Sequence, residues 1–149
     1  MQMLLKPFDE LTPAELYRII QLRNEVFVVE QNCVFQDADG KDPDSWHLMG
    51  FHNDQLIAYT RLLPPGLAYE FPSIGRVVSS PAARRTGAGR EIMKRSIEAV
   101  YELFGSHPIQ IGAQLYLEKF YNDFGFERCS EIYLEDGIQH ISMIKKPTS

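Results

Sequence analysis

The feature that most constrains the fold is a glycine-containing, arginine-rich turn between a β-branched run and a long run with helical apolar spacing. The turn reads RRTGAGREIM over residues 84–93, and it follows SIGRVVSS at 73–80. A helix N-terminus leaves backbone N–H groups without partners and carries partial positive charge. Strand, glycine turn and helix in this order therefore predict a site for an anion, commonly a phosphate.

Residues 84–95 concentrate positive charge in an acidic chain. The net charge of the protein is −5, yet this window holds a third of its 15 lysines and arginines. They are Arg84, Arg85, Arg90, Lys94 and Arg95. A solvated helix start, with glycines that serve only the turn, is the alternative interpretation. General nucleic-acid binding favours a basic protein surface, and the net charge of this protein is −5, so we expect no nucleic-acid partner.

The common nucleotide-binding motifs do not fit this turn. A P-loop needs G-x-x-x-x-G-K-[ST], and the sequence contains no such run. A dinucleotide-binding turn needs G-x-G-x-x-G, but Ile92 stands where the third glycine would follow Gly87 and Gly89. The anion predicted here is therefore not bound in either of these standard ways.

The length of 149 residues predicts a single domain over residues 1–149. No apolar run is long enough to cross a membrane, and MQMLLKPFDE does not have the form of a signal peptide. Cys33 and Cys129 form no C-x-x-C motif, so they predict two thiols rather than a disulfide framework or a zinc site. We therefore expect a cytoplasmic protein with no membrane partner.

Periodicity predicts strands interleaved with helices. Thr12, Pro13 and Glu15 form a capping-box helix start, a second helix follows the glycine turn, and a short third helix lies at 115–124. Strands are expected at 3–8, 46–52, 55–63, 73–80, 109–113, 126–134 and 138–144. The strands at 46–52 and 55–63 are expected to form a hairpin around Asn53 and Asp54. This order predicts an α/β (α+β) domain with a mixed sheet covered by helices. Residues 26–30, VFVVE, stay unassigned.

A long polar loop at residues 31–45 carries four aspartates, and loops of this length are often functional. If Gly40 is placed at the sixth position of a calcium loop, Phe35 and Trp46 take the first and twelfth positions, and neither is a ligand. We therefore expect no metal site. Asp37, Asp39, Asp42 and Asp44 are expected to form a solvated acidic loop that attracts a cationic acceptor.

Two motifs and a longer likeness suggest a family. Residues 84–89 resemble the [QR]-x-x-G-x-[GA] signature of the GNAT superfamily of acyl-CoA N-acyltransferases, and residues 120–126 resemble its F-Y-x-x-x-G-F element. The stretches RNEVFVVEQNCVFQDADGKD, GRVVSS, IGAQLYLEKFYNDFGF and EDGIQHISM are similar to the ElaA branch of that superfamily. The likeness runs along nearly the whole chain.

This resemblance implies the GNAT fold, whose mixed sheet splays open between strand four and strand five. We map these strands to residues 74–79 and 109–114. Acetyl-CoA would enter the split as co-substrate, with its pyrophosphate on the loop amides. The implied cofactor-binding residues are Val77, Val78, Arg84, Arg85, Thr86, Gly87, Ala88, Gly89, Arg90 and Gln114.

The resemblance also implies catalytic roles. Tyr121 matches the acid that protonates the departing thiolate, although a tyrosine with a satisfied hydroxyl in the core is the alternative. Strand four offers no carboxylate as a base, so the candidates are Glu30, Glu135, Asp136 and His140. Of these we select Glu30 and His140, although His140 also fits a core histidine. Arg23, Glu30, Gln31 and Arg61 either shape the acceptor pocket or form an internal ion-pair network.

The sequence thus predicts an N-acetyltransferase that moves an acetyl group from acetyl-CoA to a primary amine of a small molecule, a peptide or a lysine. One alternative is an acyl-CoA sensor that binds without catalysis, and another is an enzyme like the acyl-homoserine-lactone synthases. A structural protein whose arginine–glycine loop only docks a partner is a third. A homodimer is possible, because exposed edge strands in such sheets are often covered.

Overall fold

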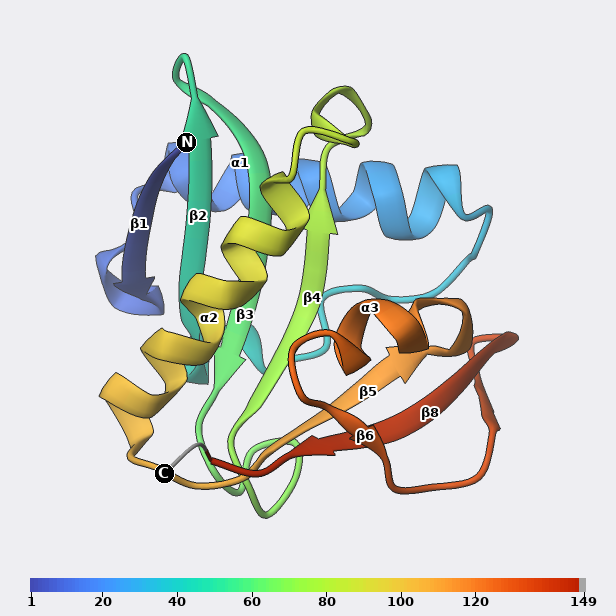
Figure 1. Ribbon diagram of the computed structural model, residues 1–149. Helices are drawn as coiled ribbons and strands as arrows, with labels where there is room; N and C mark the ends of the chain where they lie inside the picture. The colour runs from blue at the N-terminus through green and yellow to red at the C-terminus, as the bar shows by residue number, and fades with distance from the viewer. Residues whose placement is uncertain (148–149) are drawn as a thin grey trace.

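The computed structural model describes residues 1–147 and divides their strands between two antiparallel sheets (Figure 1). The first sheet has the order β1 (Gln2–Pro7), β2 (Trp46–His52), β3 (Gln55–Leu63) and β4 (Ser73–Ser79). β2 and β3 form the predicted hairpin. Its two-residue turn, Asn53 and Asp54, has φ angles of 50° and 63°, as tight hairpin turns require.

The second sheet is built on β8 (Ile138–Lys145), which pairs with β5 (Ile109–Gln114) along one edge. Its other edge pairs with β6 (Glu127–Arg128) and β7 (Tyr133–Glu135). The single strand predicted over residues 126–134 is therefore wrong. The intervening residues leave the ladder, so two short strands replace one long strand.

A backbone hydrogen bond joins the two sheets at the start of β4 and β5. There the N–H of Gln110 donates to the carbonyl of Pro72 at 3.1 Å. Beyond this point the strands run in the same general direction but diverge, and no ladder joins them (Figure 1). The predicted fold class and the splay between strands four and five are confirmed.

α1 (Pro13–Arg23) begins with the predicted capping box. The N–H of Glu15 donates to Thr12 Oγ1 at 3.1 Å, and the N–H of Thr12 donates to Glu15 Oε1 at 2.8 Å. The unassigned segment lies in a π-helix, η2 (Asn24–Glu30), that continues directly from α1. π-Helical turns are rare and often occur at functional sites.

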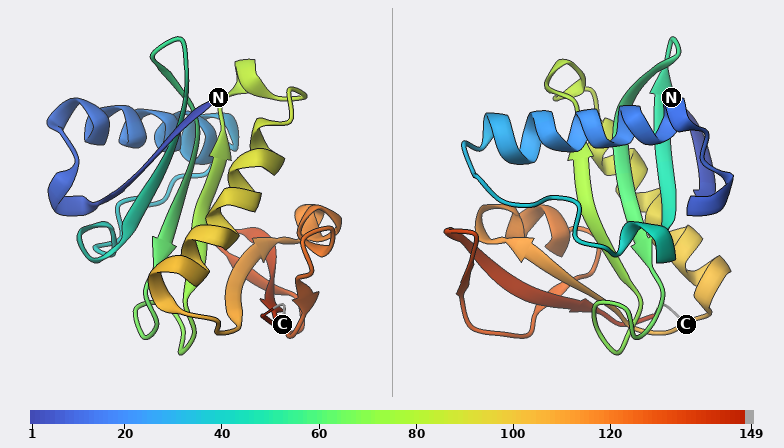
Figure 2. Two further views of the ribbon diagram at one scale, coloured as in Figure 1. Left: turned by 60° about the vertical axis from the view of Figure 1, so that its left-hand side comes forward. Right: turned by 180° about the vertical axis from the view of Figure 1, so that it is seen from behind.

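α2 (Ala88–Phe104) and α1 cover opposite faces of the first sheet, while α3 (Glu118–Asn122) lies beside β5 (Figure 2). The predicted stripe of α2 enters the core through Ile92, Met93, Ile97 and Val100. The largest core cluster also includes residues of β5 and β8. The two sheets are therefore held together by packing beneath α2 and α3 rather than by a strand ladder.

Four 3-10 turns complete the architecture: η1 (Phe8–Glu10), η3 (Asp42–Asp44), η4 (Pro81–Ala83) and η5 (Leu115–Leu117). η4 leads from β4 to the glycine turn, and η5 leads from β5 into α3. Within residues 1–147, no helix has the length and apolar character needed to span a membrane.

Candidate active site

A groove of about 900 Å³ opens where the sheets separate. Its walls come from β4, the loop before α2, the end of β5, α3, η2 and the β7–β8 turn. Eight of the predicted site residues line it: Glu30, Val77, Val78, Arg84, Gly89, Gln114, Tyr121 and His140. The fold thus brings together residues that lie up to 110 positions apart in the sequence.

The start of α2 presents free backbone donors beside this groove. Within α2 the first hydrogen bond to its N-cap runs from the Glu91 N–H to the Gly87 carbonyl at 3.0 Å, which leaves the preceding amides of the first turn without helical partners. Gly87 has φ +87° and Arg85 has φ +68°. Left-handed residues in such a turn gather N–H groups into an anion-binding concavity.

The space around the two glycines is open. A Cβ added at Gly87 or at Gly89 would meet no atom within 4 Å. A ligand can therefore approach the backbone at both positions. The sequence motif predicts this loop correctly as a glycine turn at a helix N-terminus.

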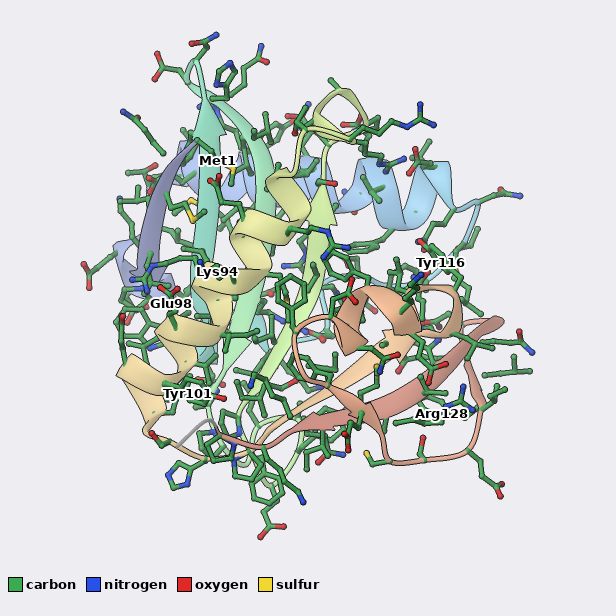
Figure 3. The ribbon with its side chains drawn as sticks, in the orientation of Figure 1. Met1, Lys94, Glu98, Tyr101, Tyr116 and Arg128 are labelled. Carbon is green, nitrogen blue, oxygen red and sulfur yellow. The ribbon has the colours of Figure 1, made fainter. Side chains whose placement is uncertain are left out.

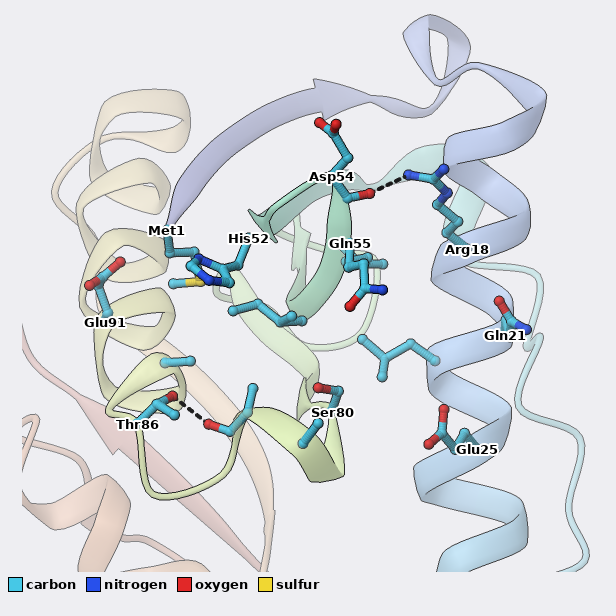
Figure 4. A pocket seen from close by; sticks show the side chains of 16 residues that line it. Met1, Arg18, Gln21, Glu25, His52, Asp54, Gln55, Ser80, Thr86 and Glu91 are labelled. Carbon is cyan, nitrogen blue, oxygen red and sulfur yellow. Dashed lines mark hydrogen bonds between the residues drawn. The ribbon is translucent and has the colours of Figure 1, made fainter.

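Side chains of the loop do not all face the groove. Thr86 and Ala88 line a second cavity of about 700 Å³ between α1 and the start of α2, where the Thr86 hydroxyl donates to the Ala83 carbonyl (Figure 4). Arg90 pairs with Asp123 at 2.9 Å and lies over the Phe120 ring. The Thr86 N–H also donates to the Ala83 carbonyl at 3.4 Å, so of these two residues only Ala88 offers its backbone amide to an anion at the helix start.

Arg84 and Glu30 join opposite walls of the groove. Arg84 Nη1 donates to Glu30 Oε2 at 2.7 Å, and Nη2 donates to the other carboxylate oxygen. The hydrogen bond from Arg84 lowers the pKa of Glu30 below its ordinary value. A carboxylate whose negative form is stabilised in this way is a weak base, so the geometry disfavours Glu30 as the proton acceptor.

Gln31 and Gln114 also bridge the split. Their side-chain amides exchange hydrogen bonds of 3.3 Å in both directions. Tyr116, two residues past Gln114, is 74% exposed and lines the groove near the start of α3 (Figure 3). Both glutamines therefore line the groove. For Gln31 this agrees with the alternative that it shapes the acceptor pocket.

Tyr121 projects from α3 into the groove and is 6% exposed. Its ring packs edge-on against Phe120 and Phe126, with centroid distances of 5.1 and 6.1 Å. Burial raises the pKa of its phenol above its ordinary value. The hydroxyl therefore stays protonated at neutral pH and is available as a donor.

His140 lies on β8 in the wall opposite β4 and is 8% exposed. Its Nδ1 is 2.8 Å from the Ile138 carbonyl, which can only accept, so the assigned tautomer carries its proton on Nδ1. Nε2 keeps a lone pair and lies 3.4 Å from Glu135 Oε2. The Glu135 carboxylate therefore lies beside the ring nitrogen of His140 that is free to accept a hydrogen bond.

β4 is the last strand of its sheet, so its second edge has no strand partner among residues 1–147. Its ladder with β3 is interrupted by a bulge. Val78 pairs with Tyr59 and Gly75 pairs with Arg61, which leaves two β4 residues opposite one β3 residue. Bulges are frequent next to active sites, where they change the direction of the groups that follow. The two bulged residues are Arg76 and Val77, and Val78 follows them.

The predicted solvated loop is wrong for Asp37, Asp39 and Asp42, which pair with arginines, whereas Asp44 is exposed as predicted. Asp37 and Asp42 are 5% and 7% exposed. Asp42 Oδ1 accepts from Arg23 at 2.8 Å and from Arg61 at 2.9 Å. The negative charges are neutralised inside the protein by arginines of α1 and β3. Arg23 and Arg61 therefore form the internal ion-pair network, the second of the alternatives left open for them.

Comparison with known proteins agrees with this geometry. The family model for an acetyltransferase (GNAT) domain matches residues 13–147. Protein ElaA of Escherichia coli is 43% identical over 93% of this chain and 92% of its own length. The crystal structure of ElaA superposes with a TM-score of 0.91 at 40% identity, over 97% of this chain and 99% of that one.

Two further solved structures share the fold. An acyl-CoA N-acyltransferase from Pseudomonas aeruginosa has a TM-score of 0.92 at 44% identity, over 97% of this chain and 99% of that chain. An aminoglycoside 6'-N-acetyltransferase complexed with coenzyme A has a TM-score of 0.71 at 14% identity, over 95% of this chain and 96% of that chain.

Proposed function

Because the chain belongs to the GNAT acetyltransferase family, we propose that it moves an acetyl group from acetyl-CoA to a primary amine. One observation carries this proposal. The groove between the two sheets brings together the free amides at the start of α2, the unpaired edge of β4 and the hydroxyl of Tyr121. In an acyl-CoA, the phosphates would bind the free amides and the amide-containing arm would pair with the β4 edge. The sulfur would receive its proton from the Tyr121 hydroxyl.

The residues present fit coenzyme A. The turn at residues 84–90 offers backbone donors with open space above Gly87 and Gly89. Arg85 adds positive charge, whereas Arg84 and Arg90 are paired with Glu30 and Asp123. The amide groups of a pantetheine arm match the unpaired β4 edge, as an added strand would. The related fold solved with coenzyme A supports this assignment.

The groove can perform each step of acyl transfer. The amine nitrogen forms a bond to the thioester carbon, and the resulting oxyanion accepts a hydrogen bond from the N–H of Val77 or Val78. His140 Nε2 takes the proton from the amine, with Glu135 stabilising the imidazolium. As the carbon–sulfur bond breaks, Tyr121 gives its proton to the thiolate. The proton held by His140 restores the phenol through solvent.

The acceptor is a primary amine of a small molecule, a peptide or a lysine side chain. Glu135 and Asp136 line the groove beside His140, so their negative charge favours an amine that arrives as an ammonium ion and releases one proton to solvent before it attacks as the neutral amine. We also propose a cytoplasmic location, which the two free thiols support. A homodimer and the absence of a nucleic-acid partner remain predictions from the sequence.

Thermal unfolding with acetyl-CoA, free CoA and ATP tests the proposal. A ligand at about a hundred times its dissociation constant adds ~2.7 kcal/mol of stability. We expect both CoA forms to raise the Tm and ATP to have little effect, and a panel of amines then to release free CoA thiol from acetyl-CoA. Stabilisation without turnover on any amine would favour a sensor. No stabilisation by either CoA form would refute the proposal.

Glu30→Gln and His140→Gln separate two candidate bases. Glu30→Gln removes the negative partner of Arg84, so Arg84 becomes available to phosphate, and affinity for CoA should rise several-fold without a large loss of kcat. His140→Gln should lower kcat about 10²-fold, because it removes the proton acceptor. Titration calorimetry with CoA and steady-state kinetics measure the two effects. If Glu30→Gln loses most of its kcat and His140→Gln does not, Glu30 rather than His140 is the base.

A further inference from the structure

Arg76 adopts a backbone conformation that side chains with a Cβ rarely take. Its φ angle is +49°, and it lies in the bulge of β4, immediately before Val77 and Val78. A left-handed residue with a Cβ is disfavoured because of its contact with the following carbonyl. Such conformations persist when the surrounding structure holds them in place, and they cluster at functional sites.

The side chain of Arg76 is held by the loop that crosses beside it. Its Nε lies 2.9 Å from Asp37 Oδ1, an ion pair whose angle is not that of a hydrogen bond. Its Nη2 donates to the Asp37 carbonyl at 2.9 Å, and its guanidinium lies 5.8 Å from the centre of the Phe35 ring. Charge, hydrogen bonding and stacking therefore act on one side chain at once.

Asp37 is itself fixed from the other side. Arg23, which is fully buried in α1, donates from Nε to Asp37 Oδ2 at 2.7 Å and from Nη2 to the Asp37 carbonyl at 3.1 Å. A second carboxylate, Asp39, lies 3.4 Å from Arg76 and is bound by Arg61 of β3. The position of the bulge is thus linked by charged side chains to α1, through the buried Asp37, and to β3, through the partly exposed Asp39.

We propose that the Arg76–Asp37 pair is a positioning device for acyl transfer. By holding Arg76 in its left-handed conformation, it fixes the bulge and aims the N–H of Val77 or Val78 at the thioester carbonyl. The proposal rests on the acyltransferase function proposed above. Arg76 acts through the backbone that follows it, so its loss should impair the polarisation of the carbonyl more than the binding of acetyl-CoA.

Two substitutions at Arg76 and one control test this role. Arg76→Val removes the clamp and adds a β-branched side chain that resists positive φ. Arg76→Gly removes the clamp but adopts positive φ freely. We expect kcat to fall about 10²-fold in Arg76→Val and less in Arg76→Gly, with the KM for acetyl-CoA within about threefold of the wild type in both. Arg18→Gln serves as the control, because Arg18 also donates to a backbone carbonyl but lies outside the groove.

A second measurement reports on the carbonyl without turnover. Acetyl-CoA labelled with ¹³C at the acetyl carbonyl should show a resonance displaced from its free position when bound to the wild type, and a smaller displacement in Arg76→Val. If Arg76→Val does not fold, Arg76→Gly carries the same comparison. If the folded variants keep the wild-type kcat and the wild-type position of the bound resonance, the proposed role of the Arg76–Asp37 pair is wrong. The proposed acyltransferase function would still stand. If the wild type does not bind acetyl-CoA, the proposed function fails and the clamp fails with it.

Discussion

Tyr121→Phe is expected to lower kcat by about 10²- to 10⁴-fold, the usual range for loss of a general acid. The substitution keeps the aromatic ring and its edge-on contacts with Phe120 and Phe126. It removes only the hydroxyl that protonates the departing thiolate. Affinity for CoA and the Tm should therefore stay close to those of the wild type. Steady-state kinetics, CoA titration and thermal unfolding measure the three quantities on one preparation.

Tyr101→Phe is the matched control for Tyr121→Phe. Tyr101 lies on α2, and its hydroxyl is buried without a hydrogen-bond partner. It does not line the groove, so its loss should leave kcat unchanged. If Tyr121→Phe also keeps the wild-type kcat, Tyr121 is a core tyrosine rather than the acid.

Arg23→Met is expected to destabilise the protein by about 3–5 kcal/mol, because removal of one partner leaves buried carboxylates without their countercharge. Arg23 is fully buried and binds both Asp37 and Asp42, at 2.7 and 2.8 Å. Denaturant unfolding measures the loss. Arg18→Met, on the exposed face of the same helix, should change the unfolding free energy by no more than about 0.5 kcal/mol. Equal effects of both substitutions would mean that the buried pairs add no specific stability.

The same ion pairs predict how stability depends on pH. Burial is the largest single influence on the pKa of Asp42 and raises it, but the hydrogen bonds and charges of Arg23 and Arg61 together outweigh burial, and the net pKa lies below the ordinary value. Asp39 behaves likewise through Arg61. A lowered folded-state pKa stabilises the protein above the unfolded pKa of about 4, and this contribution is lost as the pH falls further. The decline between about pH 4 and pH 2 should be less steep in Arg23→Met than in the wild type.

Local signals predict the parts of this fold that local interactions determine. The capping box of Thr12 and Glu15, the Asn53–Asp54 turn and the glycine turn before α2 each form where the sequence indicates. The long likeness to a known family predicts the split sheet, which periodicity alone cannot give. Residues 126–134 show the limit, since their strand pattern does not reveal where the chain leaves β8.

The ion pairs of the loop at residues 31–45 cannot be predicted from the composition of the loop itself. Its aspartates look like solvated charges because their partners, Arg23, Arg61 and Arg76, lie on three distant elements. In the sequence Arg23 and Arg61 stand among apolar residues, which indicates that they are paired inside the protein. Pairing them with the aspartates requires the tertiary fold. The left-handed conformation of Arg76 has no sequence signal, because neither glycine nor asparagine marks it.

The free edge of β4 has a consequence for solubility. An unpaired strand edge is a template on which another chain can add a strand, and this is a common start of aggregation. Here the edge faces a groove walled by α3 and η2 rather than open solvent. A slender extended molecule can lie along it, whereas a second polypeptide strand with side chains on both faces meets those walls. The fold can therefore leave the β4 edge unpaired for a ligand while the groove walls hinder aggregation through that edge.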